Sequence, residues 1–417
     1  MKVNNRWLQL GAALVAMIMI ANLQYSWTLF VKPIQAATGW KLSEISLAFT
    51  LFILFQTWVQ PLDGWLIDWL GPRLFITIAG VLCGVGWAAM GSAHTLPTFY
   101  GSYILAGVGA ALVYSGSIGS ALKWFRDRRG LAAGIIAAGF GGGTALFIPV
   151  IGYLLRTQGY SRTFLWTGIF QGAVIIVVAQ FLRHPPADAP QAVAAKSGSA
   201  TGRRTTEHFT TLEMLRTPHF YALYAMFLLM ATGGLLVTAQ AGPVAQSWGI
   251  SGAVLLLATT LNPIANGLSR ISWGWVSDRF GRENTMIVAF SLQAVCLLLV
   301  LTLGRLSPAF FVVTLVLVFF TWGEVFSLFP SISGDYFGTR HATSNYGWLY
   351  SAKGVSSILG GVVAALLYER FGSWSACFYG SAALALVAAL MAVGLRSLPL
   401  PVKRPAQLSS PLAHAIE

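Results

Sequence analysis

The feature that most constrains this chain is a series of apolar segments, each long enough to cross a lipid bilayer. A membrane-spanning helix needs about 20 mostly apolar residues. Such segments lie at 7–31, 43–69, 74–92, 98–122, 131–154, 163–182, 219–246, 252–276, 285–304, 307–331, 342–367 and 374–396. The pattern predicts an all-α membrane protein with twelve transmembrane helices.

Composition supports a membrane protein over a soluble one. Hydrophobic residues make up 56% of the chain and charged residues only 9%, whereas a soluble protein carries about 25% charged residues. The 44 glycines suit helices that pack closely inside a bilayer. The first segment is too long for the apolar core of a signal peptide, so we expect it to remain as the first helix.

The positive charges are distributed as in a multi-pass membrane protein. The net charge is +13, but the basic residues lie in short loops and form no single basic region that would suit a nucleic acid. Of the 26 Lys and Arg residues, six fall in one set of loops, two lie within spans, and the other eighteen lie on the opposite side. This bias predicts a bacterial inner-membrane protein with both termini in the cytoplasm.

A polar stretch divides the chain into two halves of six spans. Residues 183–217 are rich in Pro, Ala, Ser and Thr, which predicts a cytoplasmic linker with a short surface helix near its end. We therefore expect a six-helix bundle at 1–182, this linker, a second six-helix bundle at 218–396 and a cytoplasmic tail at 397–417. The three cysteines lie in apolar segments without motif spacing, so we expect no disulfide, metal site or cofactor.

The two halves contain a repeated motif. The sequence Gly64-Trp-Leu-Ile-Asp68-Trp-Leu-Gly71-Pro-Arg73 resembles Gly274-Trp-Val-Ser-Asp278-Arg-Phe-Gly281-Arg282, and Gly64, Asp68 and Gly71 each recur 210 residues later. Pro33 and Gly39 recur at the same offset as Pro243 and Gly249. Internal repeats of this kind are typical of transporters. The glycines would allow a sharp turn, and the charged residues a polar latch that breaks and reforms as the halves move.

Two basic residues lie within predicted spans. Arg270 falls in the span 252–276 and Lys353 in the span 342–367. A charge in the middle of a bilayer costs from about 3 to well over 10 kcal/mol unless it is paired or hydrated. Only one acidic residue, Glu324, falls plainly inside a predicted span. At least one cation therefore needs an anion from elsewhere, and a substrate can supply it.

Polar and aromatic residues mark the walls of a predicted cavity. Asn262, Asn266 and Arg270 follow one another at i,i+4 spacing and share one helix face. The first span adds a polar-aromatic segment that includes Gln24 and Tyr25. Four further aromatic residues would complete the walls: Tyr114, Trp322, Phe326 and Tyr350.

The repeated loop motif resembles that of the major facilitator superfamily. A second loop, Lys123-Trp-Phe-Arg126-Asp-Arg128-Arg129-Gly130, and its weaker counterpart Asp335-Tyr-Phe-Gly-Thr-Arg340 resemble that superfamily too. The resemblance covers the whole chain. It implies two pseudo-symmetric six-helix bundles and transport by alternating access.

Several motifs resemble the oxalate/formate antiporter family, which is related to the monocarboxylate transporters. They are Gln24-Tyr-Ser-Trp-Thr-Leu, Leu215-Arg-Thr-Pro218, Phe319-Phe-Thr-Trp322-Gly, Leu328-Phe-Pro-Ser331, Asn345-Tyr-Gly and Ala352-Lys353. The resemblance implies that Arg270 and Lys353 hold the substrate carboxylates. It also implies that Gln24, Tyr25, Tyr114 and Trp322 enclose them.

The chain departs from the oxalate-specific pattern at five positions. Phe140 and Phe326 stand where that pattern has tyrosines, Tyr350 replaces a tryptophan, Ser46 replaces a glutamine, and Glu324 replaces a glycine. Glu324 supports two interpretations. It could reduce the positive charge of the site and carry a proton, or it could face away from the cavity, because it lies about 200° round the helix from both Trp322 and Phe326.

The sequence therefore predicts a monomeric secondary transporter of small carboxylates, most simply an oxalate/formate-type anion exchanger. The alternative is a proton-coupled symporter of monocarboxylates such as lactate, pyruvate or formate. A carboxylate sensor is disfavoured because the sequence contains no attached signalling domain. An enzyme is disfavoured because no histidine lies away from the ends of the spans, and the spans contain no acid pair or nucleophile–base set with motif spacing.

Overall fold

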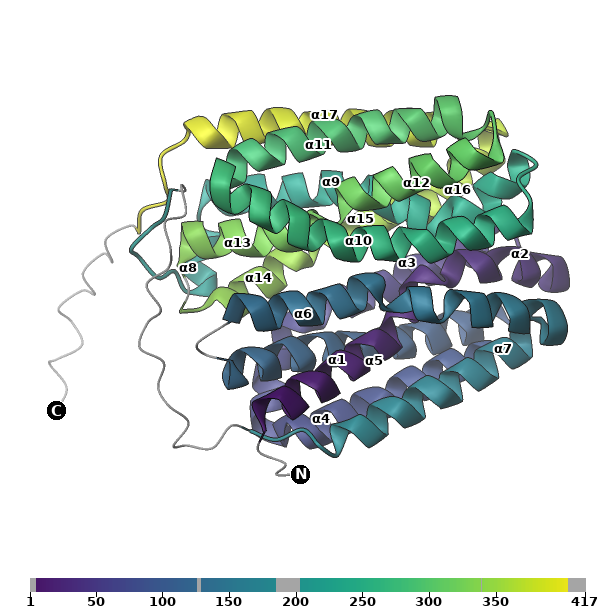
Figure 1. The fold of residues 1–417 in the computed structure, drawn as a ribbon, viewed down its shortest axis with the longest axis horizontal. Helices are drawn as coiled ribbons and strands as arrows, with labels where there is room; N and C mark the ends of the chain where they lie inside the picture. Colours follow the sequence, from purple (N-terminus) through teal and green to yellow (C-terminus); the bar gives the residue numbers. More distant parts are fainter. Residues whose placement is uncertain (1–4, 126–128, 185–202, 339, 404–417) are drawn as a thin grey trace, which may run out of the picture.

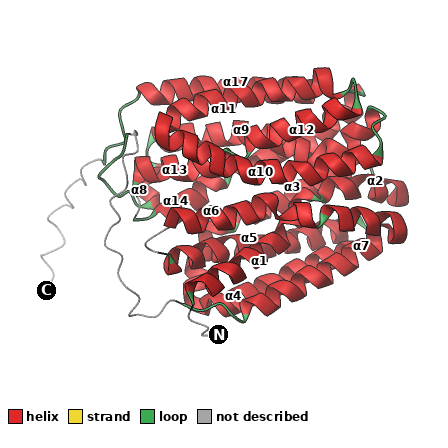
Figure 2. Ribbon diagram, viewed as in Figure 1, coloured by secondary structure: helices red, strands yellow, loops and turns green. Residues whose placement is uncertain are grey.

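The computed structural model of the chain describes residues 5–125, 129–184, 203–338 and 340–403. Every regular element in these ranges is a helix. Figure 1 and Figure 2 show the long helices side by side, with most of them along one common direction. This arrangement is the all-α architecture that the sequence predicts.

The first half contains the helices up to residue 179. Their bounds are α1 (Arg6–Tyr25), α2 (Trp27–Thr38), α3 (Leu42–Trp58), α4 (Gln60–Met90), α5 (Leu96–Trp124), α6 (Arg129–Gly142), the 3₁₀ helix η1 (Gly143–Leu146) and α7 (Ile148–Ala179). A short helix, α8 (Thr211–Leu215), follows within the expected linker.

The second half begins with α9. Its helices are α9 (Pro218–Ser247), α10 (Gly252–Phe280), α11 (Arg282–Leu299), η2 (Val300–Gly304), α12 (Pro308–Trp322), α13 (Val325–Phe337), α14 (Ala342–Tyr350), α15 (Ala352–Ser357), η3 (Ile358–Val363), α16 (Ala364–Phe371) and α17 (Ser375–Ser397). η2 and η3 are single stretches of π-helix.

Ten helical segments of the described chain are long and apolar enough to cross a membrane. One of them, Gly134–Ala179, is 46 residues long because it runs from α6 through η1 into α7. α10 is not among the ten although it has 29 residues. The polar residues that it carries, including Asn262, Asn266 and Arg270, lower its mean hydropathy. The fold is that of a multi-pass membrane protein.

Single glycines make the tightest turns between spans. Gly71 turns the chain within α4 at φ 73° and ψ 157°, and Gly159 does the same within α7 at φ 77° and ψ 174°. Gly281 separates α10 from α11 at φ 87°. Glycine tolerates positive φ because it has no Cβ atom. The turns that the repeated motif predicted at Gly71 and Gly281 are present.

Glycines also bring helices of the first half into close contact. A Cβ atom on Gly84 of α4 would lie 2.9 Å from the Cα atom of Gly172 in α7. No side chain fits between two backbones at that distance. The high glycine content thus serves the tight packing that it predicted.

The halves meet at the end of the bundle that carries α2 (Figure 1). The backbone N–H of Gly242 in α9 donates to Oγ1 of Thr28 in α2, at 2.5 Å. At the start of α3, the backbone N–H and the hydroxyl of Ser43 donate to the two carboxylate oxygens of Glu369 in α16, at 2.7 and 2.8 Å. These bonds close this end of the interface between the halves.

The described part of the linker contacts the second half at the opposite end of the bundle. The backbone N–H groups of Thr205 and Phe209 donate to the carbonyls of Asp335 and Phe337, both at 2.9 Å. The predicted short helix is present as α8. Within it, the backbone N–H of Thr210 and the ammonium of Lys403 hold the pKa of Glu213 down to about 2.

Candidate anion-binding site

The first component of the site is Arg270 on α10, whose side chain is only 5% exposed. Its Nε and Nη2 atoms donate to Oδ1 of Asn266, one turn earlier, at 3.3 and 3.0 Å. Its Nη1 atom donates to the backbone carbonyl of Ala137 in α6, at 3.0 Å. The guanidinium lies over the ring of Phe326, 4.3 Å from its centroid. Neutral groups alone therefore hold this cation in the described structure.

Lys353 lies at the start of α15, just after a helix break at Ser351, and its side chain is fully buried. Its ammonium donates to Oε1 of Gln24 in α1 at 2.9 Å and to Oε1 of Gln56 in α3 at 3.1 Å. A third bond, of 3.2 Å, reaches the hydroxyl of Tyr350. Two glutamines of the first half thus solvate a cation of the second half.

The two cations share one site. The ring of Phe326 lies 4.3 Å from the Arg270 guanidinium carbon and 5.7 Å from the Lys353 ammonium. Cation–π contacts and amide oxygens stabilise a positive charge without neutralising it. Among the described residues, the ion pairs found involve neither Arg270 nor Lys353. The site therefore carries two buried charges with no counterion from the described part of the protein.

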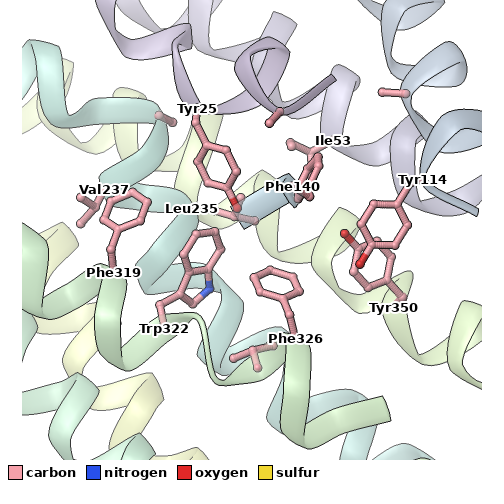
Figure 3. Close-up of a cluster of buried hydrophobic side chains, with 14 of the residues drawn as sticks. Tyr25, Ile53, Tyr114, Phe140, Leu235, Val237, Phe319, Trp322, Phe326 and Tyr350 are labelled. Atoms are coloured by element: carbon pink, nitrogen blue, oxygen red, sulfur yellow. The ribbon is translucent and has the colours of Figure 1, made fainter. Parts of the chain in front are cut away.

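Aromatic side chains lie against the two cations, and Figure 3 shows the aromatic cluster to which they belong. Trp322 and Phe326 point from one side toward Tyr25 and Phe140 on the other. The ring centroids of Tyr25 lie 5.6 Å from Phe140 and 6.5 Å from Trp322. Tyr114 stacks on Tyr350 at 5.5 Å and meets Phe140 at 5.3 Å. The enclosure is built from both halves of the chain, and its side chains are buried.

Several hydrogen-bond donors in this region have no partner within the protein. They are Nε2 of Gln24, Nε2 of Gln56, Nδ2 of Asn266, Nε1 of Trp322 and the hydroxyl of Tyr25. A buried polar group without a partner costs about 1–3 kcal/mol. An anion is the ligand that satisfies donors and cations together. The hydrogen-bond donors without partners and the two cations therefore both favour an anionic ligand.

Glu324 lies at the break between α12 and α13 and is fully buried. Neither of its carboxylate oxygens has a hydrogen-bond partner among the described residues, and no ion pair to it is found there. A structural ion pair with another helix, which the sequence left open, is therefore absent from the described structure.

Asp63 is a second buried acid, which falls within the predicted span 43–69 but was assigned to a helix end. It lies in the first turn of α4, is 1% exposed and accepts a bond of 2.5 Å from the Ser115 hydroxyl. It forms no ion pair with Arg270 or Lys353 in the described structure, where the hydrogen bonds of both cations go to neutral oxygens. The sequence-based count of one acid within the spans was therefore too low. The additional acid, Asp63, still leaves both cations without a counterion in the described structure.

The structure brings most of the expected site residues together and adds one. Arg270, Lys353 and Asn266 meet the expected walls, which are Gln24, Tyr25, Tyr114, Trp322, Phe326 and Tyr350. Asn262 lines a small separate cavity beside Tyr25, and Ser46 bonds to Gln240. Gln56 is the residue that the sequence missed. Its only sequence signal was a polar side chain within an apolar span.

The repeated motif residues lie away from these cations. In the second copy, Arg282 pairs with Asp278 at 2.7 Å and with Asp335 at 3.1 Å, and Arg204 of the linker also pairs with Asp335. In the first copy, Nε of Arg73 donates to Oε1 of Gln180 at 2.7 Å. Gly64 and Asp68 lie on α4, but the side-chain surroundings of these two positions are not described. A Cβ atom built on Gly274 would lie 3.9 Å from Cβ of Ser327, so there is room for a side chain at this position.

Metal binding has no support among the described residues, where no three His, Cys, Asp or Glu side chains lie close enough to hold an ion. Chemically, the site is a buried cluster that brings two basic side chains together. Arginine's planar fork suits two carboxylate oxygens, and lysine acts as a point charge.

Known proteins resemble this chain along its whole length. The Major Facilitator Superfamily model matches residues 12–244 and 221–414. The oxalate:formate antiporter of Oxalobacter formigenes is 38% identical over 406 residues, which cover 97% of this chain and 95% of that protein. Monocarboxylate transporter 12 of Xenopus laevis is 26% identical over 338 residues, 76% of this chain and 73% of that protein. The uncharacterized MFS-type transporter YhjX of Escherichia coli is 26% identical over 355 residues, which cover 85% of this chain and 86% of that protein.

Proposed function

Because this chain belongs to the major facilitator superfamily, we propose that it is a secondary transporter that exchanges small carboxylate anions, of the oxalate/formate type, by alternating access. The observation that carries the proposal is a buried site with two cations, Arg270 and Lys353, and no counterion among the described residues. The similarity to an oxalate:formate antiporter supports the same substrate class.

The proposed topology has twelve spans in two six-helix bundles, residues 1–182 and 218–396. The linker and both termini lie in the cytoplasm of a bacterial cell, and the monomer is the transporting unit. The excess of basic residues on one side of the spans supports this orientation. In this topology, the end of the bundle that carries α2 faces outward.

Substrate binding follows from the geometry of the two cations. One carboxylate accepts hydrogen bonds from the guanidinium of Arg270 in place of Asn266. A second charge or a polar end meets the ammonium of Lys353 and the free Nε2 donors of Gln24 and Gln56. The ring of Phe326 contacts both cations. A dianion neutralises both charges at once.

The same charges favour exchange over one-way transport. An empty site that closes must exclude water from two positive charges, and isolated buried charges cost several kcal/mol each. A bound anion removes most of that cost. The halves therefore change between the outward-open and inward-open arrangements more readily when the site holds an anion.

The test is a flux measurement in proteoliposomes. Vesicles are loaded with formate or oxalate, or left empty, and uptake of labelled oxalate is followed. We expect rapid uptake into loaded vesicles and little into empty ones. Equal uptake into both would contradict exchange.

A proton-coupled monocarboxylate symporter is the second candidate function, favoured by one observation. Glu324 is fully buried and neither carboxylate oxygen has a partner, so the residue could bind and release a proton as the site opens. The discriminating experiment imposes a pH gradient on empty vesicles. Gradient-driven lactate or formate uptake that Glu324→Gln abolishes would favour symport over exchange.

A further inference from the structure

A groove of about 520 Å³ lies at the turn of α4, where that turn meets the C-terminal end of α7. Its walls are formed by Leu70, Gly71, Pro72, Arg73, Leu74, Thr77, Gln180, Leu182, Arg183 and His184. The groove is separate from the cation site, because the two share no residue. Its residues come from the first half of the chain and from Arg183 and His184 at the start of the linker.

The polar side chains of the groove are basic or neutral. Arg73, Arg183 and His184 line it, and none of its described side chains is acidic; the side chain of Asp68 is not among those described. Nε of Arg73 donates to Oε1 of Gln180 at 2.7 Å, and Nε2 of Gln180 donates to Thr77 at 3.1 Å. These neutral partners fix the Arg73 side chain and leave its charge in place. The ion pairs found among the described residues include neither Arg73 nor Arg183.

Gly71 makes the turn of α4 beside the groove. Its φ of 73° favours glycine, whereas a Cβ atom built on it would only meet Nε2 of His184 at an ordinary contact distance of 3.7 Å. The glycine is therefore needed for the backbone turn. The basic side chains of the groove come from this turn and from the residues that directly follow α7.

An apolar face of α4 continues from the groove along the helix. Leu74 is 49% exposed, Ile78 37%, Val81 45% and Val85 54%. Their spacing of four, three and four residues places them on one side of the helix. In a membrane protein, such exposed apolar side chains face lipid. The feature as a whole has a basic groove at one end and an apolar stripe leading away from it.

We propose that this groove binds the headgroup of an anionic phospholipid of the cytoplasmic leaflet, with an acyl chain along the stripe Leu74, Ile78, Val81 and Val85. The inference rests on the proposed topology, which places the turn of α4 at the cytoplasmic surface. Arg73 and Arg183 pair with the phosphodiester, and a basic site at this depth favours anionic over zwitterionic lipids. The bound lipid joins the turn of α4 to the end of α7.

The basic groove and the apolar stripe together indicate which molecule binds. A free phosphate would use the arginines but not the apolar stripe. A zwitterionic lipid would use the stripe but would bring no net negative charge to the arginines. An anionic phospholipid satisfies both, since its headgroup is charged and its chains are apolar.

The experiment measures lipid retention by the full-length protein. The protein is purified from vesicles that contain equal amounts of phosphatidylglycerol and phosphatidylcholine, and bound lipids are counted by native mass spectrometry. We expect selective retention of phosphatidylglycerol. Arg73→Gln/Arg183→Gln should reduce that retention by about tenfold or more, whereas Arg73→Lys/Arg183→Lys should largely keep it, because the charge remains.

A matched control replaces exposed basic residues at the other end of the bundle, Lys32→Gln/Lys41→Gln, and should retain the lipid fully. Leu74→Ser/Ile78→Ser disrupts the stripe and leaves the arginines intact, so it should also lower retention. Circular dichroism and thermal unfolding confirm that each variant is folded. Unchanged phosphatidylglycerol retention by the folded double arginine variant would overturn the proposal. The proposal would also be overturned if inorganic phosphate alone displaced phosphatidylglycerol and if Leu74→Ser/Ile78→Ser left phosphatidylglycerol retention unchanged.

Discussion

The two halves of this chain contribute opposite chemistry to one site. The second half provides both cations, Arg270 and Lys353, whereas the first half provides neutral acceptors. The acceptors are the amide oxygens of Gln24 and Gln56 and the carbonyl of Ala137. The repeated motif recurs in both halves, yet their contributions to this site differ. Under the proposed function, the second half would select the charge of the substrate and the first half would set its fit.

The contacts between the halves explain how a substrate could control their movement. In this structure the ammonium of Lys353 is bound to two glutamines of the other half. An anion that binds the ammonium weakens its bonds to the two glutamines. The Nε2 groups of these glutamines can then donate to the anion. Binding at the site and packing between the halves are therefore alternatives for the same atoms.

The largest effect is expected from removing a cation of the second half. Arg270→Ala or Lys353→Ala should lower oxalate exchange by about a hundredfold or more, because truncating a buried charged partner costs about 2–5 kcal/mol. The measurement is the initial exchange rate in proteoliposomes at matched protein density. Arg279→Ala, an exposed arginine on the same helix, is the control. Near-normal exchange by both cation variants would remove the proposed division between the halves.

A smaller effect is expected from the neutral side of the site. Gln24→Ala or Gln56→Ala should raise the half-saturating oxalate concentration by about tenfold, because each removes one donor to the anion and one acceptor from Lys353. Dose–response curves of exchange for each variant measure this. If the glutamine variants were as damaging as the cation variants, charge and fit would not be divided between the halves.

Glu324 tests whether the acid of the second half belongs to the transport chemistry. If the protein is an exchanger, Glu324→Gln keeps oxalate exchange close to its original rate, because a buried carboxyl group without a partner is replaced by a neutral group of similar shape. The readout is exchange at neutral pH with no pH gradient. A loss of exchange as severe as that of Lys353→Ala would place Glu324 within the anion site.

The outer contact between the halves should matter less. Glu369→Gln weakens the hydrogen bonds to Ser43 and should favour opening at the end that carries α2 by about threefold. The measurement is the labelling rate of Thr28→Cys by a membrane-impermeant thiol reagent. The native cysteines are buried and should give little background. Unchanged labelling would show that other contacts hold this end closed.

The smallest effect is expected at residues 203–217 of the linker, where the backbone N–H groups of Thr205 and Phe209 donate to carbonyls of the second half. The pKa of Glu213 is lowered from 4.5 to about 2, so its contacts with Thr210 and Lys403 stabilise the docked linker above pH 4.5. That stabilisation is lost progressively as pH falls from about 4.5 toward 2. A dye on Thr206→Cys should gain mobility over this range, and Glu213→Gln should remove the dependence. A dye signal that changes only near neutral pH would contradict this assignment.

The sequence predicted the helices better than their interruptions. Each apolar segment corresponds to helical residues, because burial in a bilayer requires helices of a definite length. The breaks at Ser26, at Val59 and at Gly323–Glu324 had no clear sequence signal. They depend on packing between helices, as where Gly323 meets Ser269 and Asn266 of α10.

The candidate site could be predicted in part for a physical reason. Arg270 and Lys353 were conspicuous because charges are costly inside a membrane. Gln56 was not, because an amide within an apolar span has no distinctive spacing and its orientation depends on the packing of α3 against α15. Asp63 was assigned to a helix end, and only the tertiary structure shows that it is buried.

Anion binding by the purified protein tests the central claim most directly. Oxalate and formate are titrated by calorimetry into the wild-type protein and into Arg270→Gln, Lys353→Gln and the control Lys32→Gln. The proposed two-cation site predicts binding by the wild type and the control, with oxalate favoured over formate, and no measurable binding by either cation variant. Unchanged oxalate binding by folded Arg270→Gln and Lys353→Gln would contradict it.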